Sequence, residues 1–203
     1  MSGSQPHALA PSDSSHAVSL AARAFADDPL FRYIYPDPAS RERRFAREHA
    51  AYLRWIYRPV GLAETVGDVD GLALWLLPES FHQLGWREAA CLPALVRSVG
   101  VRRLPVVWRT YKAFDPFYPT DVPFHYLGLL AVEPEAQGKG LGSALLRAGL
   151  ARADAQGVGT YLETSTEANV AFYRAHGFDI RHEIPLPDGA PTHVGMWRPP
   201  GAG

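Results

Sequence analysis

The sequence has little of several features that would each indicate a particular class of protein. It contains one cysteine, Cys91, so no disulfide can form within the chain. No segment approaches the ~18 apolar residues of a membrane-spanning helix, and the first residues lack the pattern of a secretory signal. The formal net charge of −1 gives no broad electrostatic reason to bind nucleic acid or an anionic membrane. We therefore expect a cytoplasmic protein that binds neither.

What is present is the composition of a globular protein, with 47% hydrophobic and 20% charged residues. A chain of 203 residues can bury a core of its own, so we expect a single domain over residues 1–203. Residues 1–13 are expected to be flexible, although residues 7–10 could add a short edge strand. Histidine and cysteine show no spacing typical of a metal site, so we expect no metal.

Hydrophobic periodicity predicts an ordered series of helices and strands. Helices are expected over 15–25, ending at Asp27-Asp28-Pro29, and over 39–57, followed by a hairpin of strands 61–66 and 69–77. Residues 79–120 break the strand pattern and predict a helical insert. After it we expect a strand over 124–132, a helix over 140–156, a strand over 160–165, a helix over 167–175, and strands over 178–184 and 192–197. This order predicts an α/β protein.

A glycine-rich loop joins the predicted strand 124–132 to the helix that follows. Pro134 ends the strand, and the loop reads Gln137-Gly-Lys-Gly-Leu-Gly142. Its glycines leave backbone amides uncovered, so that phosphates can approach those amides and the positive end of the helix. The spacing fits neither the Walker loop nor the dinucleotide-binding fingerprint. The loop therefore indicates a pyrophosphate site of another kind, with a simple flexible turn as the alternative.

A second motif runs from Leu162 to Phe178 and predicts a strand, a short helix and a Gly-Phe entry into the next strand. Thr164 and Glu167 have the spacing of a capping box, and Asn169 and Tyr173 share one helical face because they are four residues apart.

Together the two motifs resemble the signatures of the GNAT superfamily of acyl-CoA-dependent N-acyltransferases. The resemblance implies a mixed central sheet with splayed central strands, flanking helices, and a helical insert between the third and fourth core strands. It implies acetyl-CoA as co-substrate. Over most of the chain it extends to the branch that acetylates puromycin, and it is weakest over residues 81–126, where residues that bind the amine are expected to differ.

The resemblance also implies roles for individual residues. Tyr173 would protonate the departing CoA thiolate, and Glu163 would act as general base; a packed tyrosine and an exposed or ion-paired glutamate are the alternatives. Residues expected to contact acetyl-CoA are Leu130, Ala131, Val132, Gln137, Gly138, Lys139, Gly140, Leu141, Gly142, Ser143, Asn169 and Phe172. The family usually has an asparagine at the position that is Thr166 in this sequence, so Asn169 departs from the usual pattern. His125 could either bind the amine or be structural.

The first hypothesis for function is acetylation of a primary amine of a small molecule, such as an antibiotic or a toxic metabolite, by direct attack in a ternary complex. The alternatives are acetylation of a protein or peptide amine and a catalytically silent CoA-binding sensor. A monomer and a homodimer both remain open.

Overall fold

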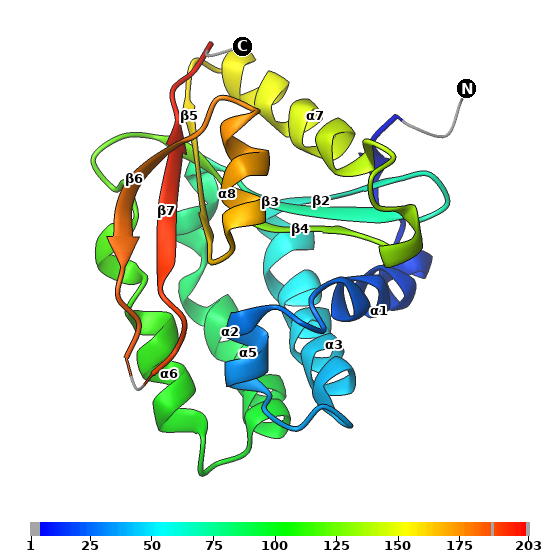
Figure 1. Ribbon diagram of the computed structural model, residues 1–203, viewed down its shortest axis with the longest axis vertical. Helices are drawn as coiled ribbons and strands as arrows, with labels where there is room; N and C mark the ends of the chain where they lie inside the picture. The colour runs from blue at the N-terminus through cyan, green and yellow to red at the C-terminus, as the bar shows by residue number, and fades with distance from the viewer. Residues whose placement is uncertain (1–4, 188, 202–203) are drawn as a thin grey trace.

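A mixed sheet organises the described part of the chain, with strands in the spatial order β1-β2-β3-β4-β5-β7-β6 (Figure 1). The computed structural model describes residues 5–187 and 189–201, so residues 1–4 of the segment expected to be flexible lie outside the described residues. The strands are β1 (His7–Ala8), β2 (Gly61–Val66), β3 (Gly71–Leu76), β4 (Phe124–Val132), β5 (Gly159–Thr164), β6 (Asp179–Ile184) and β7 (His193–Arg198). Only β4 and β5 pair in parallel among these neighbours, which confirms the mixed sheet.

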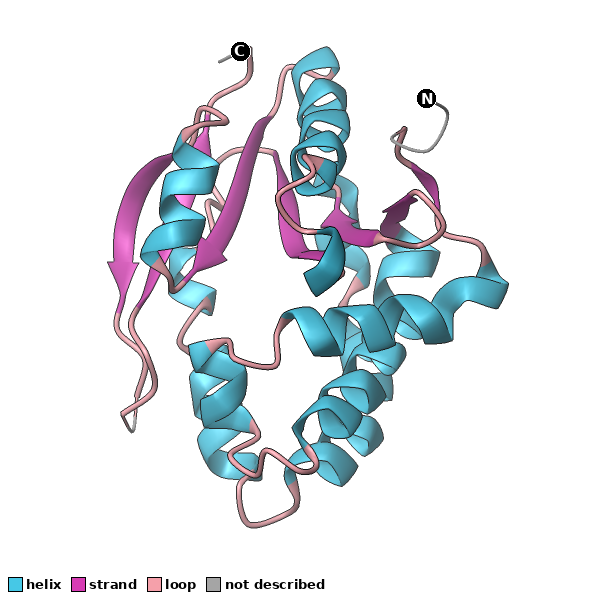
Figure 2. Ribbon diagram, turned by 45° about the vertical axis from the view of Figure 1, so that its right-hand side comes forward, coloured by secondary structure: helices cyan, strands magenta, loops and turns pink. Residues whose placement is uncertain are grey.

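Helices cover both faces of this sheet (Figure 2). They are α1 (Ser14–Ala24), α2 (Pro29–Ile34), α3 (Arg41–Tyr52), α4 (Arg58–Val60), α5 (Gly85–Val99), α6 (Leu104–Lys112), α7 (Leu141–Ala155) and α8 (Glu167–Arg174). Leu72 and Leu74 of β3 pack in one core with α1 and α3, whereas Ala73 and Trp75 pack in a second core with α7 and α8. Successive strand side chains point to opposite faces, so this alternation buries the sheet on both sides. None of the helices in the described ranges has the length and apolar character needed to cross a membrane.

The short helix α2 was not expected from the sequence. Asp27-Asp28-Pro29 indicated the end of the first helix, and α1 does end at Ala24. Pro29 also opens α2, because a first-turn N–H needs no helical partner, and the Asp28 side chain accepts hydrogen bonds from Leu30 N at 2.9 Å and Phe31 N at 3.2 Å. The same residues therefore end one helix and begin another.

The helix expected over 39–57 changes its winding near its end. It begins as α3, continues as one π-helical turn over Leu53–Tyr57, and ends as α4. π-helical turns are rare and occur often at functional sites. This one places Tyr57 against β4, where a Cβ on Gly128 would lie 2.1 Å from the Tyr57 hydroxyl. Gly128 is therefore the residue that permits this close approach.

The helical insert lies between β3 and β4, as expected. It comprises η3 (Pro78–Gln83), α5, α6 and η4 (Asp115–Phe117). Arg44 of α3 donates to the carbonyl of Ser98 at 3.1 Å and Arg47 to the carbonyl of Arg97 at 3.0 Å, both near the end of α5. The insert is thereby tied to the helices that cover the sheet.

A buried carboxylate adds a second tie between α3 and the insert. Glu48 is fully buried and accepts hydrogen bonds from the hydroxyls of Tyr35, Tyr52 at 2.8 Å and Tyr111 at 2.9 Å. Loss of hydration raises the pKa of the Glu48 carboxyl, while the three hydroxyls oppose that rise. Because Tyr52 belongs to α3 and Tyr111 to α6, this carboxylate fixes two tyrosines that line the cavity described next.

The two central strands separate along their length. β4 and β5 pair only through Phe124–Gly159, His125–Thr160 and Tyr126–Tyr161 in the described chain, although β4 continues to Val132 and β5 to Thr164. The pairing of β3 with β4 shifts register at Gly128, which marks a β-bulge there. The splayed central strands expected from the resemblance are therefore confirmed.

Candidate active site

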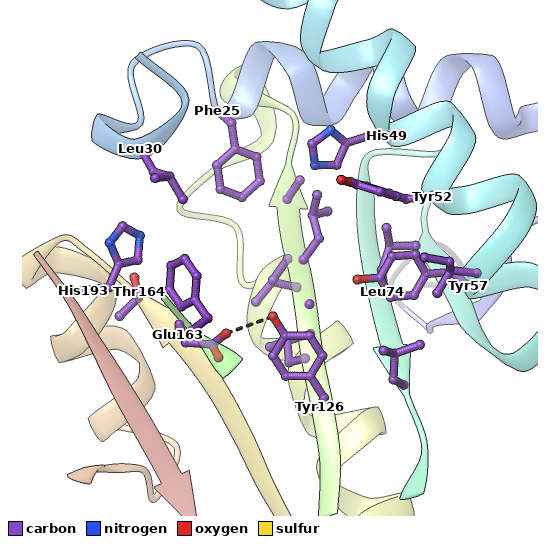
Figure 3. Close-up of a pocket in the computed structure, with 18 of the residues that line it drawn as sticks. Phe25, Leu30, His49, Tyr52, Tyr57, Leu74, Tyr126, Glu163, Thr164 and His193 are labelled. Atoms are coloured by element: carbon purple, nitrogen blue, oxygen red, sulfur yellow. Dashed lines mark hydrogen bonds between the residues drawn. The ribbon is translucent and has the colours of Figure 1, made fainter. Parts of the chain in front are cut away.

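A cavity of about 1470 Å³ opens where β4 and β5 separate (Figure 3). One part is lined by the glycine loop, the end of β4 and α8; another is lined by α2, α3 and the helical insert. A single small-molecule site usually occupies roughly 300–1,000 Å³. This cavity is therefore large enough for two substrates that must meet.

The glycine loop presents its backbone to this cavity. Gly138 and Gly140 have φ of +75° and +81°, and a Cβ on either would have no atom within 4 Å. The loop is held by Gln137, which donates to the Val132 carbonyl at 3.2 Å, and by Lys139, which donates to the Glu135 carbonyl at 2.9 Å. α7 begins directly afterwards, so open backbone and the positive helix end coincide. This is a geometry that fits a pyrophosphate.

Of the residues expected to contact acetyl-CoA, all except Lys139 line the cavity. They are Leu130, Ala131, Val132, Gln137, Gly138, Gly140, Leu141, Gly142, Ser143, Asn169 and Phe172. Gly142 differs from the other two loop glycines because it is helical, and a Cβ there would lie 3.4 Å from a Val132 methyl carbon, an ordinary contact. The end of β4 has no β5 partner beyond Tyr126 in the described chain, so its backbone faces the opening.

We expect Gly140→Ala to raise the KM for acetyl-CoA several-fold. A Cβ would intrude where phosphates approach, and the left-handed backbone would be strained by about 1 kcal/mol. The matched control is Gly157→Ala at the end of α7, with φ +67° and no atom within 4 Å of its added Cβ. It carries the same strain away from the cavity, so equal KM values in the two variants would contradict this role.

Glu163 is a half-buried carboxylate that lines the cavity from β5, beside the opening. Tyr126 of β4 donates to its Oε2 at 2.9 Å (Figure 3). Its Oε1 is buried and makes no hydrogen bond of ordinary length in the described part of the chain. Burial raises the pKa of the Glu163 carboxyl to about 7, against the opposing effect of the hydroxyls of Tyr126 and Tyr161. A carboxylate with this pKa can accept a proton at neutral pH.

Tyr173 reaches the same cavity from α8. The residue is 9% exposed, and its ring packs edge-on against Phe172 and Phe178, with centroids 5.2 and 5.7 Å away. Burial raises the pKa of the Tyr173 phenol, which therefore stays protonated at neutral pH. Tyr173 can thus serve as a proton donor.

The capping residue of α8 differs from the expected Thr164. The side chain of Thr166 accepts a hydrogen bond from Asn169 N at 3.2 Å and so caps this helix.

The part of the cavity beneath α2, α3 and the insert is predominantly aromatic. His49 stacks on Phe45 with centroids 3.7 Å apart, and burial lowers the pKa of His49 to about 4, so it is uncharged at neutral pH. Other ring-bearing residues of this wall are Phe25, Phe31, Tyr52, Tyr57, Phe81, Tyr111, Phe114, Tyr118 and Tyr126. Such walls favour an apolar or aromatic ligand.

His125 does not line the cavity. It is fully buried and hydrogen-bonded through Nε2 to Gln156 Oε1 at 2.7 Å. The sequence did not indicate His49, Tyr126 or Tyr161 as site residues, because each of them lies outside the two motifs over 137–142 and 162–178. The spacing of Phe45, Glu48, His49 and Tyr52 is a helical stripe and could have drawn attention to the first of these.

Comparison with known proteins identifies the class. The model of the acetyltransferase (GNAT) family matches residues 26–178. An uncharacterized N-acetyltransferase of Schizosaccharomyces pombe is 27% identical over 183 residues, covering 86% of this chain and 74% of that protein. A structure from Corynebacterium glutamicum, described as histone acetyltransferase HPA2 and related acetyltransferase, is 28% identical with a TM-score of 0.76, covering 99% of this chain and 98% of that one. A phosphinothricin acetyltransferase from Sinorhizobium meliloti, solved with acetyl-CoA, is 18% identical with a TM-score of 0.52 over 100% and 91% of the two chains.

The splayed sheet and the glycine loop at the start of α7 define an acyl-CoA-dependent transferase fold. The chain belongs to the acetyltransferase (GNAT) family, as its motifs over 137–142 and 162–178 indicated. It is an N-acetyltransferase that depends on acetyl-CoA.

Proposed function

We propose that this protein acts in the cytoplasm and acetylates the primary amine of a small molecule that carries an apolar or aromatic group. The observation that carries the proposal is the continuity of the cavity: the glycine loop, the half-buried Glu163 and the aromatic wall all line one space. The neighbour from Sinorhizobium meliloti, solved with acetyl-CoA, supports acetyl-CoA as the co-substrate. The resemblance to enzymes that acetylate puromycin supports an antibiotic or related toxic amine as acceptor.

Glu163 prepares the amine for attack in this proposal. An amine arrives at neutral pH as an ammonium ion, which has no lone pair with which to attack. Glu163 takes one proton from it, and the pKa of about 7 lets the carboxylate do so without holding the proton too tightly. His49, uncharged at neutral pH, does not repel the ammonium form on its way in.

Tyr173 completes the transfer in this proposal. Acetyl-CoA supplies the acetyl group activated as a thioester. Backbone N–H groups near Leu130, on the part of β4 without a β5 partner, are placed to polarise the thioester carbonyl. Tyr173 then donates its phenolic proton to the leaving sulfur. The amine attacks directly, so the reaction needs no nucleophilic side chain.

A peptide or protein amine is the second candidate, because acidic residues of the cavity can attract it as well. Glu88, Asp115 and Asp121 are exposed and line the cavity on the insert side. Such carboxylates would attract a basic peptide as readily as a small cation. The aromatic wall beneath them favours the small molecule, because a peptide N-terminus needs an open groove.

The test is the release of CoA thiol from acetyl-CoA in the presence of a panel of amines: arylalkyl amines, puromycin, polyamines, aminoglycosides and short peptides. We expect the largest kcat/KM with amines that carry an aromatic group. Release confined to peptides would replace the proposal with the second candidate. Measurable binding of acetyl-CoA with no release for any amine would favour the silent sensor.

A further inference from the structure

A buried histidine at the start of β7 lies on the same face of the sheet as Glu163. Gly195 of β7 pairs directly with Glu163 of β5, so these two residues point to one face. His193 comes two residues before Gly195 on the same strand and therefore points to that face as well. Diagonal neighbours of this kind lie about 7–8 Å apart. His193 and Glu163 both line the cavity, and Figure 3 shows them on the same side of it.

The hydrogen bonding of His193 decides which of its ring nitrogens can bind a ligand. Nδ1 lies 3.0 Å from the carbonyl oxygen of Pro191. A carbonyl oxygen can only accept, so Nδ1 carries the hydrogen, and in the neutral ring Nε2 holds a lone pair. Within residues 5–187 and 189–201, Nε2 has no hydrogen-bond partner. The ring thus offers one unused acceptor.

The surroundings of His193 keep its ring in place and uncharged. The residue is 5% exposed, and Phe114 of the helical insert packs edge-on against the ring, with centroids 5.4 Å apart. Burial lowers the pKa of His193, while the hydrogen bond to Pro191 and the charge of Asp28 act in the opposite direction. Because burial has the larger effect, the imidazole is neutral at neutral pH and can accept a hydrogen bond from a cation.

Asp28 brings a carboxylate to the same part of the cavity from the start of α2. It lines the cavity, and its Oδ1 accepts the hydrogen bonds of Leu30 N and Phe31 N that cap the helix. These N–H groups stabilise the ionised form and oppose the rise that burial causes in the pKa of the Asp28 carboxyl. Asp28 and His193 lie close enough for the charge of each to change the pKa of the other. A negative charge therefore lies near the unused lone pair.

We infer that His193 binds the reacting amine: its Nε2 accepts a hydrogen bond from an N–H group that Glu163 does not take, and Asp28 attracts the ammonium form to this place. The inference rests on the proposed function and names the residues that hold the amine in it. Glu163 remains the base. His193 binds the amine and neither gains nor loses a proton.

The geometry of an ammonium ion fits two acceptors on one sheet face. The ion carries three N–H donors, and a nitrogen that donates to two acceptors spans roughly 5 Å between them. Glu163 Oε1 makes no hydrogen bond of ordinary length in the described chain, and His193 Nε2 makes none at all there. One N–H bond breaks as its proton passes to Glu163. The hydrogen bond to His193 still holds the neutral amine while its lone pair turns to the thioester carbonyl.

The experiment compares His193→Phe and His193→Gln with the wild-type protein, using an amine that the wild type acetylates. Phenylalanine keeps a ring beside Phe114 but has no acceptor. We expect the KM for the amine to rise about tenfold or more in His193→Phe, the usual effect of losing a hydrogen bond to a charged group, with kcat much less affected. Glutamine has both an acceptor and a donor, so His193→Gln should recover most of the affinity. The KM for acetyl-CoA should be unchanged in both variants.

Asp28→Asn tests the contribution of the charge. Asparagine is also a good capping residue, so α2 should persist while the negative charge is lost. We expect the KM for the amine to rise several-fold, again with the KM for acetyl-CoA unchanged. A KM for the amine equal to that of the wild type would remove Asp28 from the inference.

The matched control is His176→Phe. Nδ1 of His176 also bonds a backbone carbonyl, that of Phe172 at 2.8 Å, but His176 does not line the cavity. This variant should keep the wild-type KM for the amine.

Three outcomes would overturn the role of His193 and leave the proposed function standing, provided that Glu163→Gln has lost activity. The first is an unchanged KM for the amine in His193→Phe. The second is an equal increase in His193→Phe and His193→Gln, which would indicate a structural role. The third is a large loss of kcat in His193→Phe with the KM for the amine unchanged, which would indicate a role in proton transfer. A wild-type protein that binds acetyl-CoA but acetylates no small amine would overturn both.

Discussion

Replacing Glu163 by glutamine should lower kcat by about 10²–10⁴-fold, the usual contribution of a general base. Glutamine has nearly the same shape, so the hydrogen bond from Tyr126 can persist while the proton acceptor is lost. The wild-type rate should rise with pH through about 7, because only the ionised carboxyl can take a proton and burial raises its pKa to about 7. In the variant this rise should disappear. The measurement is kcat against pH for both proteins.

Tyr126→Phe provides a graded control for the same residue. The Tyr126 hydroxyl stabilises the Glu163 carboxylate and so lowers its pKa. Removing that hydroxyl should raise the pKa further and move the rise in activity to higher pH, with the plateau rate largely retained. If Glu163→Gln keeps the wild-type pH profile, another group is the base.

Replacing Tyr173 by phenylalanine should lower kcat by about 10²-fold while leaving the affinity for acetyl-CoA near the wild-type value. The ring contacts with Phe172 and Phe178 are preserved in this variant, so the loss would report the hydroxyl and not the packing. Turnover from thiol release, together with acetyl-CoA binding by calorimetry, separates the two quantities.

The matched control for Tyr173 is Tyr33→Phe, which removes a tyrosine hydroxyl on α2 outside the cavity wall. It should retain wild-type turnover and acetyl-CoA affinity. Equal turnover in Tyr173→Phe and the wild type would remove Tyr173 from the mechanism and support the alternative of a packed tyrosine.

The glycine loop, with its place between β4 and α7, could be predicted from the sequence because its signals are local. A strand, a proline, the glycines of 137–142 and a helix follow one another, and each residue acts on its immediate neighbours. The backbone angles of Gly138 and Gly140 agree with that analysis. Gly142 shows the limit of that analysis, because its conformation is helical and an added Cβ would make only an ordinary contact with Val132.

The amine half could not be predicted, because its residues meet only through tertiary structure. Tyr126 reaches Glu163 through the parallel register of β4 and β5, and Tyr57 reaches β4 through a π-helical turn and the glycine at position 128. No spacing along the chain encodes either contact. The same holds for His193, which comes to the same face as Glu163 only through the pairing of β7 with β5.

α2 was missed for a different reason, since its signal was present and misinterpreted. A proline after two aspartates is compatible with the end of one helix and with the beginning of the next. Asp28 caps α2, and the two readings differ only in whether Leu30 and Phe31 have a core to pack against. Leu30 and Phe31 do pack against the core cluster that includes Phe45 of α3.

The most direct test is the identity of the product when the wild-type protein, acetyl-CoA and an arylalkyl amine react together. Mass spectrometry should show the amine carrying one acetyl group, formed in equal amount to free CoA thiol, with no acetyl group left on the protein. Acetyl-CoA that binds at the glycine loop but yields no acetylated amine, with any amine of the panel, would contradict the assignment of Glu163 and Tyr173 as a catalytic pair.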